Sequence, residues 1–314
     1  MTKIVDKIFN EEITSIKSTR LNDKYNDIAK DFMEPCLSEC KYLRRDTGWF
    51  QSSSLKAWVG ALEHLIEKES NDIKLEYLCS PGTDLRTIQA IKASKSPQKK
   101  EEILRESKNK LILDTVLLSA ANNINQVGSA NKTIGQVLAH LIVTGKLEIR
   151  FAEVQDFENL ILITDEMADP ELYHPKMGYF AFSDGSEISF NGSMNESYGG
   201  LKKQGEYVDI FCSKRSWEIK KIREHYDTLN DAWNGLEGGT RIIKTSDTTI
   251  DELNRFLKKN PITKRKTGTN TPTPIPESTM APVKNKLRDY QKEAIDQWFK
   301  NDGRGLFEHA TGSG

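Results

Sequence analysis

The sequence of 314 residues lacks any apolar run near 18 residues and shows no signal peptide. It therefore predicts a soluble, cytoplasmic protein without a membrane partner. It also lacks an excess of charge of either sign, because its formal net charge is −1. A nearly neutral chain has no strong nonspecific attraction for nucleic acid, so any basic surface must be local. The apolar content is about average and allows one sizeable core, or a main domain with a smaller piece.

Cysteine is scarce, with four residues: Cys36, Cys40, Cys79 and Cys212. Only "CLSEC" places two of them close together, and no second pair follows at the spacing of a zinc site. We therefore expect reduced thiols, as is usual for a cytosolic protein, and no bound metal.

Alternating helical and strand patterns predict an α/β fold with a mixed β-sheet flanked by helices. Residues 1–45 are charged and mostly helical in pattern. "TIGQVLAHLIVTGKLEIRFAEV" indicates a helix that ends near Gly145, followed by a strand. "KMGYFAF" and "SEISFNGS" indicate a hairpin turned at Asp184 and Gly185, and "GEYVDIFCS" a further strand. "WEIKKIREHYDTLNDAWNGL" is typical of a long amphipathic helix.

The composition changes at about residue 258. Five of the ten prolines lie between residues 258 and 285, among threonines and basic residues, so this stretch cannot build a core and predicts an extended linker. An exposed loop within one domain is the alternative, but the length of the stretch favours a linker. The predicted organisation is a helical segment at 1–45, the main domain at 46–257, the linker at 258–285 and a further piece at 286–314.

Four polar residues stand in two pairs near the predicted hairpin. His174 and Lys176 are two residues apart at the start of a strand, so both face the same way, and Ser193 and Asn195 repeat this spacing after Gly192. An imidazole, an ammonium, a hydroxyl and an amide together suit a phosphodiester, since the imidazole can attack phosphorus while the others stabilise the oxyanion. Each residue taken alone is more often structural, and Gly-Ser-x-Asn alone is more often a turn.

A carboxylate is needed to orient the imidazole and to stabilise its cationic form. Glu206 opens the next strand and is the first candidate to reach His174. Glu196 is the rival candidate.

The pattern His-x-Lys followed by Gly-Ser-x-Asn resembles the signature of the phospholipase D superfamily, and the resemblance covers roughly residues 46–236. "FNGSMNES" and "EYVDIFCS" are similar to bacterial nuclease domains fused to superfamily 2 helicases. The resemblance implies that His174 is the nucleophile and forms a phosphohistidine. It implies that Lys176, Ser193 and Asn195 bind phosphate, and that Glu206 supports the histidine. It also implies that catalysis needs no metal.

Two features depart from the superfamily pattern. The phospholipases carry an aspartate five residues beyond the motif lysine; here Ala181 takes that position, and Asp184 is out of phase. This argues against a lipase. The chain also has one motif where the chemistry uses two facing histidines, one as nucleophile and one as general acid. We therefore expect a homodimer with the active site on its two-fold axis.

The last residues carry a second pattern. "LRDYQ" followed by "GLFEHATGSG" resembles the start of a superfamily 2 helicase motor. The resemblance implies that Gln291 contacts adenine and that Thr311, Gly312, Ser313 and Gly314 belong to a phosphate-binding loop. The pattern stops before the lysine and the Mg²⁺-binding hydroxyl, so ATP and Mg²⁺ are expected only for a longer helicase. A flexible tail is the alternative interpretation.

These patterns predict a metal-independent endonuclease that cleaves nucleic acid, with DNA favoured over RNA, as the front part of a helicase-nuclease in antiphage or restriction defence. The alternative is a catalytically weak module that dimerises and binds nucleic acid for the helicase. Lipid hydrolysis is disfavoured by the single motif and by Ala181.

Overall fold

The computed structural model describes residues 2–17, 27–48, 61, 65–66, 73–79, 90, 93–121, 126–127, 132–154, 175–194, 206–236 and 240–262. The chain divides into two compact units, Met1–Arg265 and Lys266–Gly314, and every described residue belongs to the first. The predicted helicase piece at 286–314 and the predicted linker beyond residue 262 therefore lie outside the described residues.

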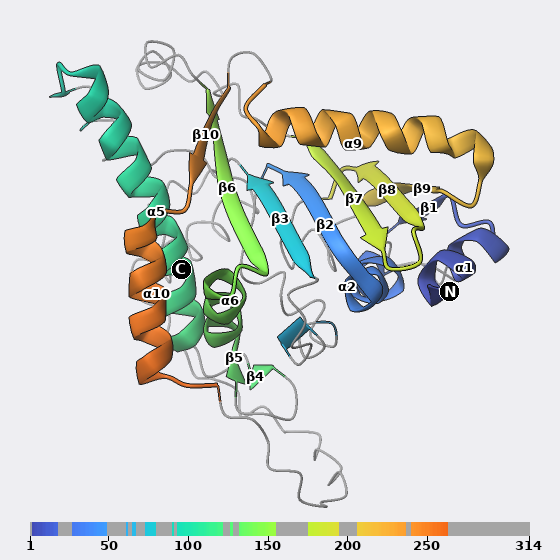
Figure 1. Ribbon diagram of the computed structural model, residues 1–314, viewed down its shortest axis with the longest axis horizontal. Helices are drawn as coiled ribbons and strands as arrows, with labels where there is room; N and C mark the ends of the chain where they lie inside the picture. Colours follow the sequence, from blue (N-terminus) through green and yellow to red (C-terminus); the bar gives the residue numbers. More distant parts are fainter. Residues whose placement is uncertain are drawn as a thin grey trace, which may run out of the picture. The chain divides into compact units, whose positions relative to one another are not determined.

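The described residues form one large mixed sheet (Figure 1). The three strands β2, β3 and β6 run parallel to one another, and the strands on either side of them are antiparallel to their neighbours. This confirms the predicted mixed α/β fold. In spatial order the sheet contains β1 (Ser15–Lys17), β9 (Tyr207–Cys212), β8 (Glu187–Gly192), β7 (Lys176–Phe182), β2 (Cys40–Thr47), β3 (Lys74–Cys79), β6 (Leu147–Val154) and β10 (Thr240–Lys244). A separate pair joins β4 (Gln126–Val127) to β5 (Lys132–Thr133).

Helices cover both faces of the sheet, and α9 lies along β7, β8 and β9 while α5, α6 and α10 gather beside β6 and β10 (Figure 1). The face opposite α9 buries the main apolar cluster, to which α1, α2, α5, α6 and α10 contribute. None of the described helices is both long enough and apolar enough to cross a bilayer. The helices are α1 (Lys3–Asn10), α2 (Glu34–Glu39) after a π-helical turn (Ala29–Met33), α5 (Pro97–Ala121), α6 (Ile134–Val143), α9 (Ile219–Trp233) after a 3-10 turn (Ser216–Glu218), and α10 (Asp247–Lys259).

The strongly patterned elements are confirmed. The predicted hairpin is β7 and β8, joined through Asp184 and Gly185, and the predicted long amphipathic helix is α9. Residues 134–143 form α6, and strand β6 follows it. In each case the periodicity of apolar residues matches the face that becomes buried.

The N-terminal residues are helical in α1, in the π-helical turn and in α2, as predicted, but they also contain two strand segments that the helical prediction did not include. Strand β1 pairs with β9 at the edge of the sheet and buries only Ile16, and β2 begins at Cys40 and becomes a central strand. The region after α9 also holds β10 and α10, which the sequence analysis did not predict, and α10 extends to Lys259, inside the predicted linker. Short elements of this kind depend on partners distant in the sequence.

All four cysteines lie in described parts of the chain, where they are buried and form no disulfide with one another. Within the described residues, no group of three His, Cys, Asp or Glu side chains could hold a metal ion.

An ionic cluster around the buried carboxylate of Glu76 connects the central strands β2 and β3 with helix α9. Glu76 accepts hydrogen bonds from the hydroxyl of Tyr42 at 2.6 Å and from Nε of Arg44 at 2.8 Å, and pairs with Lys74 at 2.7 Å. Burial alone would raise the pKa of Glu76, but the hydrogen bonds from these three side chains outweigh it and lower the pKa. Arg44 also lies over the ring of Trp233, so the cluster fixes α9 to the sheet.

His225 is a buried imidazole between α9 and the sheet. Its Nδ1 lies 3.0 Å from the Ser189 hydroxyl, and its ring packs edge-on against Phe211. Burial, helped by the charge of Lys221, lowers the pKa of His225 to about 4 from an ordinary 6.5.

This shift predicts a loss of stability in acid. Above pH 6.5 the imidazole is neutral in both the folded and the unfolded chain, and between pH 6.5 and 4 only the unfolded chain takes up the proton. The free energy of unfolding should therefore fall by about 3 kcal/mol across this window. Urea unfolding of wild type and His225→Gln at pH 7 and pH 4.5 measures it, with His140→Gln on α6 as control. If the free energy of unfolding of His225→Gln falls as much between pH 7 and pH 4.5 as that of wild type, the prediction is wrong.

Candidate active site

Four strand ends meet at one edge of the sheet, by which we mean the edge formed by the ends of strands and not an outermost strand. Strand β2 ends at Thr47, which pairs with Lys176 at the start of β7, and β8 ends at Gly192, which pairs with Val208 near the start of β9. Because β7, β8 and β9 are consecutive antiparallel strands, the start of β7, the end of β8 and the start of β9 lie side by side. The sequence-predicted residues Lys176, Ser193 and Glu206 are thereby brought to the same edge.

Ser193 is held by the strand next to it. Its backbone N–H donates to the carbonyl of Tyr207 at 3.1 Å, and its hydroxyl accepts from the N–H of Tyr207 at 3.2 Å. The same hydroxyl donates a hydrogen bond to a carboxylate oxygen of Glu206. The direct contact of Ser193 with Glu206 was not predicted from the sequence, which assigned the two side chains to different partners.

Gly192 is required by the close approach of β8 to β9. A Cβ at this position would lie 2.0 Å from the carbonyl oxygen of Tyr207, so no larger residue fits without moving the backbone. The glycine thus permits the paired backbone geometry that fixes Ser193.

Lys176 is partly buried at the first position of β7. Burial lowers the pKa of Lys176, the charge of Arg45 lowers it further, and the carboxylate of Glu206 acts in the opposite direction. The ammonium of Lys176 is repelled by the charge of Arg45 and attracted by that of Glu206. An anion bound beside Lys176 would offset the repulsion between Lys176 and Arg45.

Arg45 is a residue of this site that the sequence analysis missed. Its side chain is fully buried on β2, and Nη2 donates to the carbonyl oxygen of Met194 at 2.8 Å. A sequence signal did exist, because alternation along β2 places Arg45 on the same face as Leu43, where an apolar residue is the rule.

The other predicted site residues lie outside the described residues: His174, Asn195 and the rival Glu196 beside the signature, and Gln291, Thr311, Gly312, Ser313 and Gly314 near the C-terminus. The predicted contact of Glu206 with His174 therefore stays a prediction. Asp184 lies in the hairpin turn, at the end of β7 remote from Lys176, and its carboxylate accepts from the N–H groups of Thr2 and Ser186.

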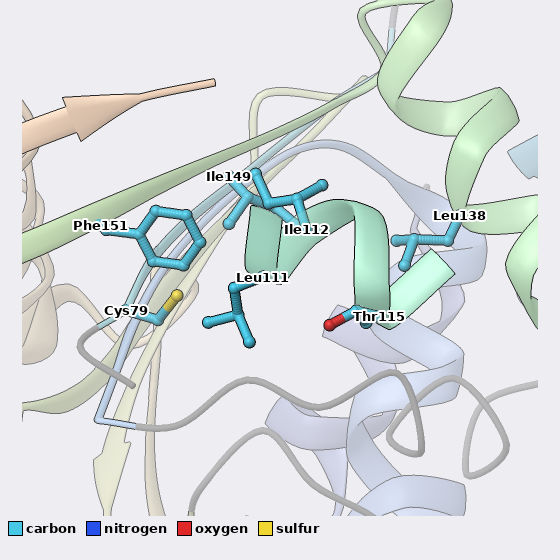
Figure 2. Close-up of a pocket in the computed structure, with 7 residues that line it drawn as sticks. All are labelled: Cys79, Leu111, Ile112, Thr115, Leu138, Ile149 and Phe151. Atoms are coloured by element: carbon cyan, nitrogen blue, oxygen red, sulfur yellow. The ribbon is translucent and has the colours of Figure 1, made fainter. Parts of the chain in front are cut away.

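A pocket with an empty volume of about 330 Å³, part of it open to solvent, lies between α5 and the sheet. Figure 2 shows Phe151 and Cys79 from the sheet facing Leu111 and Ile112 from α5. Among the described residues that line it, Thr115 carries a hydroxyl and Cys79 a thiol, and none carries a charge. This described lining offers no cation to a phosphate, so it differs in chemistry from the edge that carries Lys176.

No protein-family model matches the chain, and no curated protein matches it. Among solved structures, the chain is similar to Nuc, a phospholipase D family member from Salmonella typhimurium, with 10% sequence identity and a TM-score of 0.33. The match covers 73% of this chain and 95% of that chain. A TM-score of this size leaves the chemistry of the site to be judged from its own residues.

Proposed function

We propose that the chain is a metal-independent phosphodiesterase that cleaves nucleic acid. The observation that carries the proposal is the meeting of Lys176, Ser193 and Glu206 at one edge of the sheet, with Ser193 bound directly to Glu206. Lys176, Gly192 and Ser193 are the described part of the His-x-Lys and Gly-Ser-x-Asn signature, and Glu206 is the carboxylate that the resemblance implies beside it. Fixed cationic and hydroxyl donors stabilise the charge that develops on a phosphoryl group under attack.

In the proposed reaction an imidazole nitrogen of His174 attacks phosphorus. A P–N bond forms while the P–O bond to the leaving oxygen breaks, and a second histidine donates a proton to that oxygen. The second histidine then takes a proton from water, and the water oxygen displaces His174 from phosphorus. Lys176, Ser193 and Asn195 would hold the non-bridging oxygens through both steps.

The second histidine is proposed to come from a second copy of the chain, because the sequence carries one His-x-Lys motif. Light scattering at micromolar concentration should therefore give twice the chain mass. A monomer that still cleaves its substrate would rule out the paired-histidine mechanism.

Glu206 should contribute more to turnover than Glu196. Glu206→Gln removes the negative charge that receives the hydrogen bond of Ser193, and we expect kcat to fall about 100-fold. Glu196→Gln should have a much smaller effect and serves as the matched control. Steady-state cleavage by the two variants measures both, and the reverse order would exchange the roles of the two glutamates.

The test of the proposed function is cleavage in EDTA, with single- and double-stranded DNA and RNA as substrates. Wild-type cleavage in EDTA supports a metal-independent phosphodiesterase and identifies the substrate, for which DNA is the proposed choice. The assay is repeated with protein in excess over substrate, and with the full-length protein in the presence of ATP. Tight binding of nucleic acid without cleavage under these conditions would instead support the binding module.

A helicase motor that uses ATP and Mg²⁺ and a role in defence against foreign nucleic acid are a wider proposal. Both rest on the resemblance of residues 287–291 and 309–314 to a superfamily 2 motor. Nucleic-acid-stimulated ATP hydrolysis by the full-length protein tests the first, and protection of cells from phage tests the second.

A further inference from the structure

Arg45 carries a charge in a place where the fold would otherwise bury an apolar residue. Its side chain is 0% exposed and lies on the same face of β2 as Leu43, while the next-door Arg44 faces α9. Removing an ionised side chain from water costs several kcal/mol unless charges and hydrogen bonds compensate it. A position that keeps such a group calls for an explanation in terms of its contacts.

The guanidinium of Arg45 reaches across β7 because β7 has no side chain in its path. Arg45 pairs with Gly178 on β7, and a Cβ on Gly178 would lie 2.2 Å from the ring of Phe190 on β8. The ring of Phe190 therefore crosses over Gly178, and the guanidinium lies 4.9 Å from its centroid. This cation–π contact helps to hold the guanidinium at the ring of Phe190.

At the far end of this path Arg45 holds the loop that carries the signature serine. Its Nη2 donates to the carbonyl oxygen of Met194 at 2.8 Å, and the side chain of Met194 is itself fully buried. Met194 lies between Ser193 and Asn195 in the chain. A charge-assisted hydrogen bond at this carbonyl fixes the backbone next to Ser193, the described one of the two predicted phosphate ligands.

Arg45 also adds charge to the site. Thr47 pairs with Lys176 and Arg45 with Gly178, so Arg45 and Lys176 are diagonal neighbours on one face of adjacent strands. The formal charges of Arg45, Lys176 and Glu206 sum to one positive charge, which a phosphodiester monoanion would neutralise.

We propose that Arg45 is a positioning residue of the phosphodiester site, which fixes the loop of Gly192, Ser193 and Met194 and supplies a permanent positive charge behind Lys176. The identity of the anion rests on the proposed function. The binding of an anion at this edge and its dependence on Arg45 can be measured without cleavage.

The experiment compares Arg45→Lys and Arg45→Gln with Arg44→Lys and Arg44→Gln. The two arginines are adjacent and both buried, but Arg44 binds Glu76 and Asn230 on the opposite face. Three quantities are measured for each variant: kcat and KM for cleavage, the dissociation constant of inorganic phosphate by ³¹P NMR titration, and the midpoint of urea unfolding. Arg45→Lys keeps a charge but offers one ammonium in place of the planar fork.

For Arg45→Lys we expect kcat to fall about 10- to 100-fold and phosphate to bind about 10-fold more weakly, because a small displacement of positioned groups is costly. Arg44→Lys should leave both quantities close to wild type. Equal effects of Arg45→Lys and Arg44→Lys, or effects that only follow the unfolding midpoint, would overturn the inference. If Arg45→Gln does not fold, Arg45→Lys decides alone.

The phosphate titration separates this inference from the proposed function. Wild-type cleavage that Arg45→Lys does not change overturns the inference and leaves the function standing. Phosphate binding that depends on Arg45, in a wild-type protein that does not cleave, supports the inference and removes the proposed function. A wild-type protein that neither cleaves nor binds phosphate overturns both.

Discussion

His174→Ala should reduce cleavage by about 10⁴-fold or more, because removing the proposed nucleophile of a concerted catalytic set would cost nearly the whole acceleration that the set provides. None of the described side chains at the edge that carries Lys176 is an imidazole, so none of them can take over this role. The fold should survive, since the strands that meet at this edge are held by their own pairing and core contacts.

Single-turnover cleavage measures this effect, and acid quenching of labelled substrate should trap a phosphohistidine in wild type and not in the variant. Circular dichroism and light scattering check that the variant keeps the fold and the molecular mass of wild type. His140→Ala on α6 is the matched control and should cleave like wild type. Undiminished cleavage by His174→Ala would falsify the assignment of the nucleophile.

Gly192→Ala should destabilise the protein by about 3 kcal/mol or more, since the added methyl group meets backbone and overpacking against a fixed neighbour is costly. The Cβ would lie 2.0 Å from the carbonyl oxygen and 2.9 Å from the carbonyl carbon of Tyr207. Strands β8 and β9 would have to separate where the N–H of Ser193 donates to this carbonyl. Activity should fall with stability because Ser193 moves with the strand.

Gly178→Ala provides the comparison for Gly192→Ala. At Gly178 the added Cβ would meet the side chain of Phe190, so Phe190→Leu should recover part of the loss in the double variant. At Gly192 the obstacle is backbone, and Phe190→Leu should simply add its own cost. Urea unfolding of the singles and doubles gives both coupling energies. Equal coupling energies between Phe190→Leu and each of the two glycine substitutions would contradict the distinction between a side-chain clash at Gly178 and a backbone clash at Gly192.

Local chemistry explains which elements could be predicted. The hairpin of β7 and β8 follows from alternating apolar residues on both sides of a turn dipeptide, and α9 follows from its apolar stripe. Strand β1 contains three residues, and only its pairing with β9 makes it a strand. No periodicity can be read from so short a segment, so the sequence did not separate this strand from the helical residues around it.

The site was predictable as far as its residues form a spaced motif. The spacing of Lys176, Ser193 and Glu206 places them at consecutive strand ends, and the structure brings them to one edge. Arg45 belongs to no motif, because its role depends on the absence of a side chain at Gly178 and on the ring of Phe190. Those contacts join β2 to the hairpin of β7 and β8, which lies far from β2 in the sequence.

The two adjacent arginines of β2 also have a consequence for folding. A slip of β2 by one residue would turn Arg45 toward α9 and Arg44 toward the apolar cluster. A slip in one direction puts Leu43 in the place of Arg44, and Glu76 loses the guanidinium that it binds. A slip in the other direction puts Asp46 in the place of Arg45, and the carbonyl of Met194 loses its donor. Both errors leave buried polar groups without their partners, so the pair penalises misaligned strands and selects the one alignment in which each arginine meets its own acceptor.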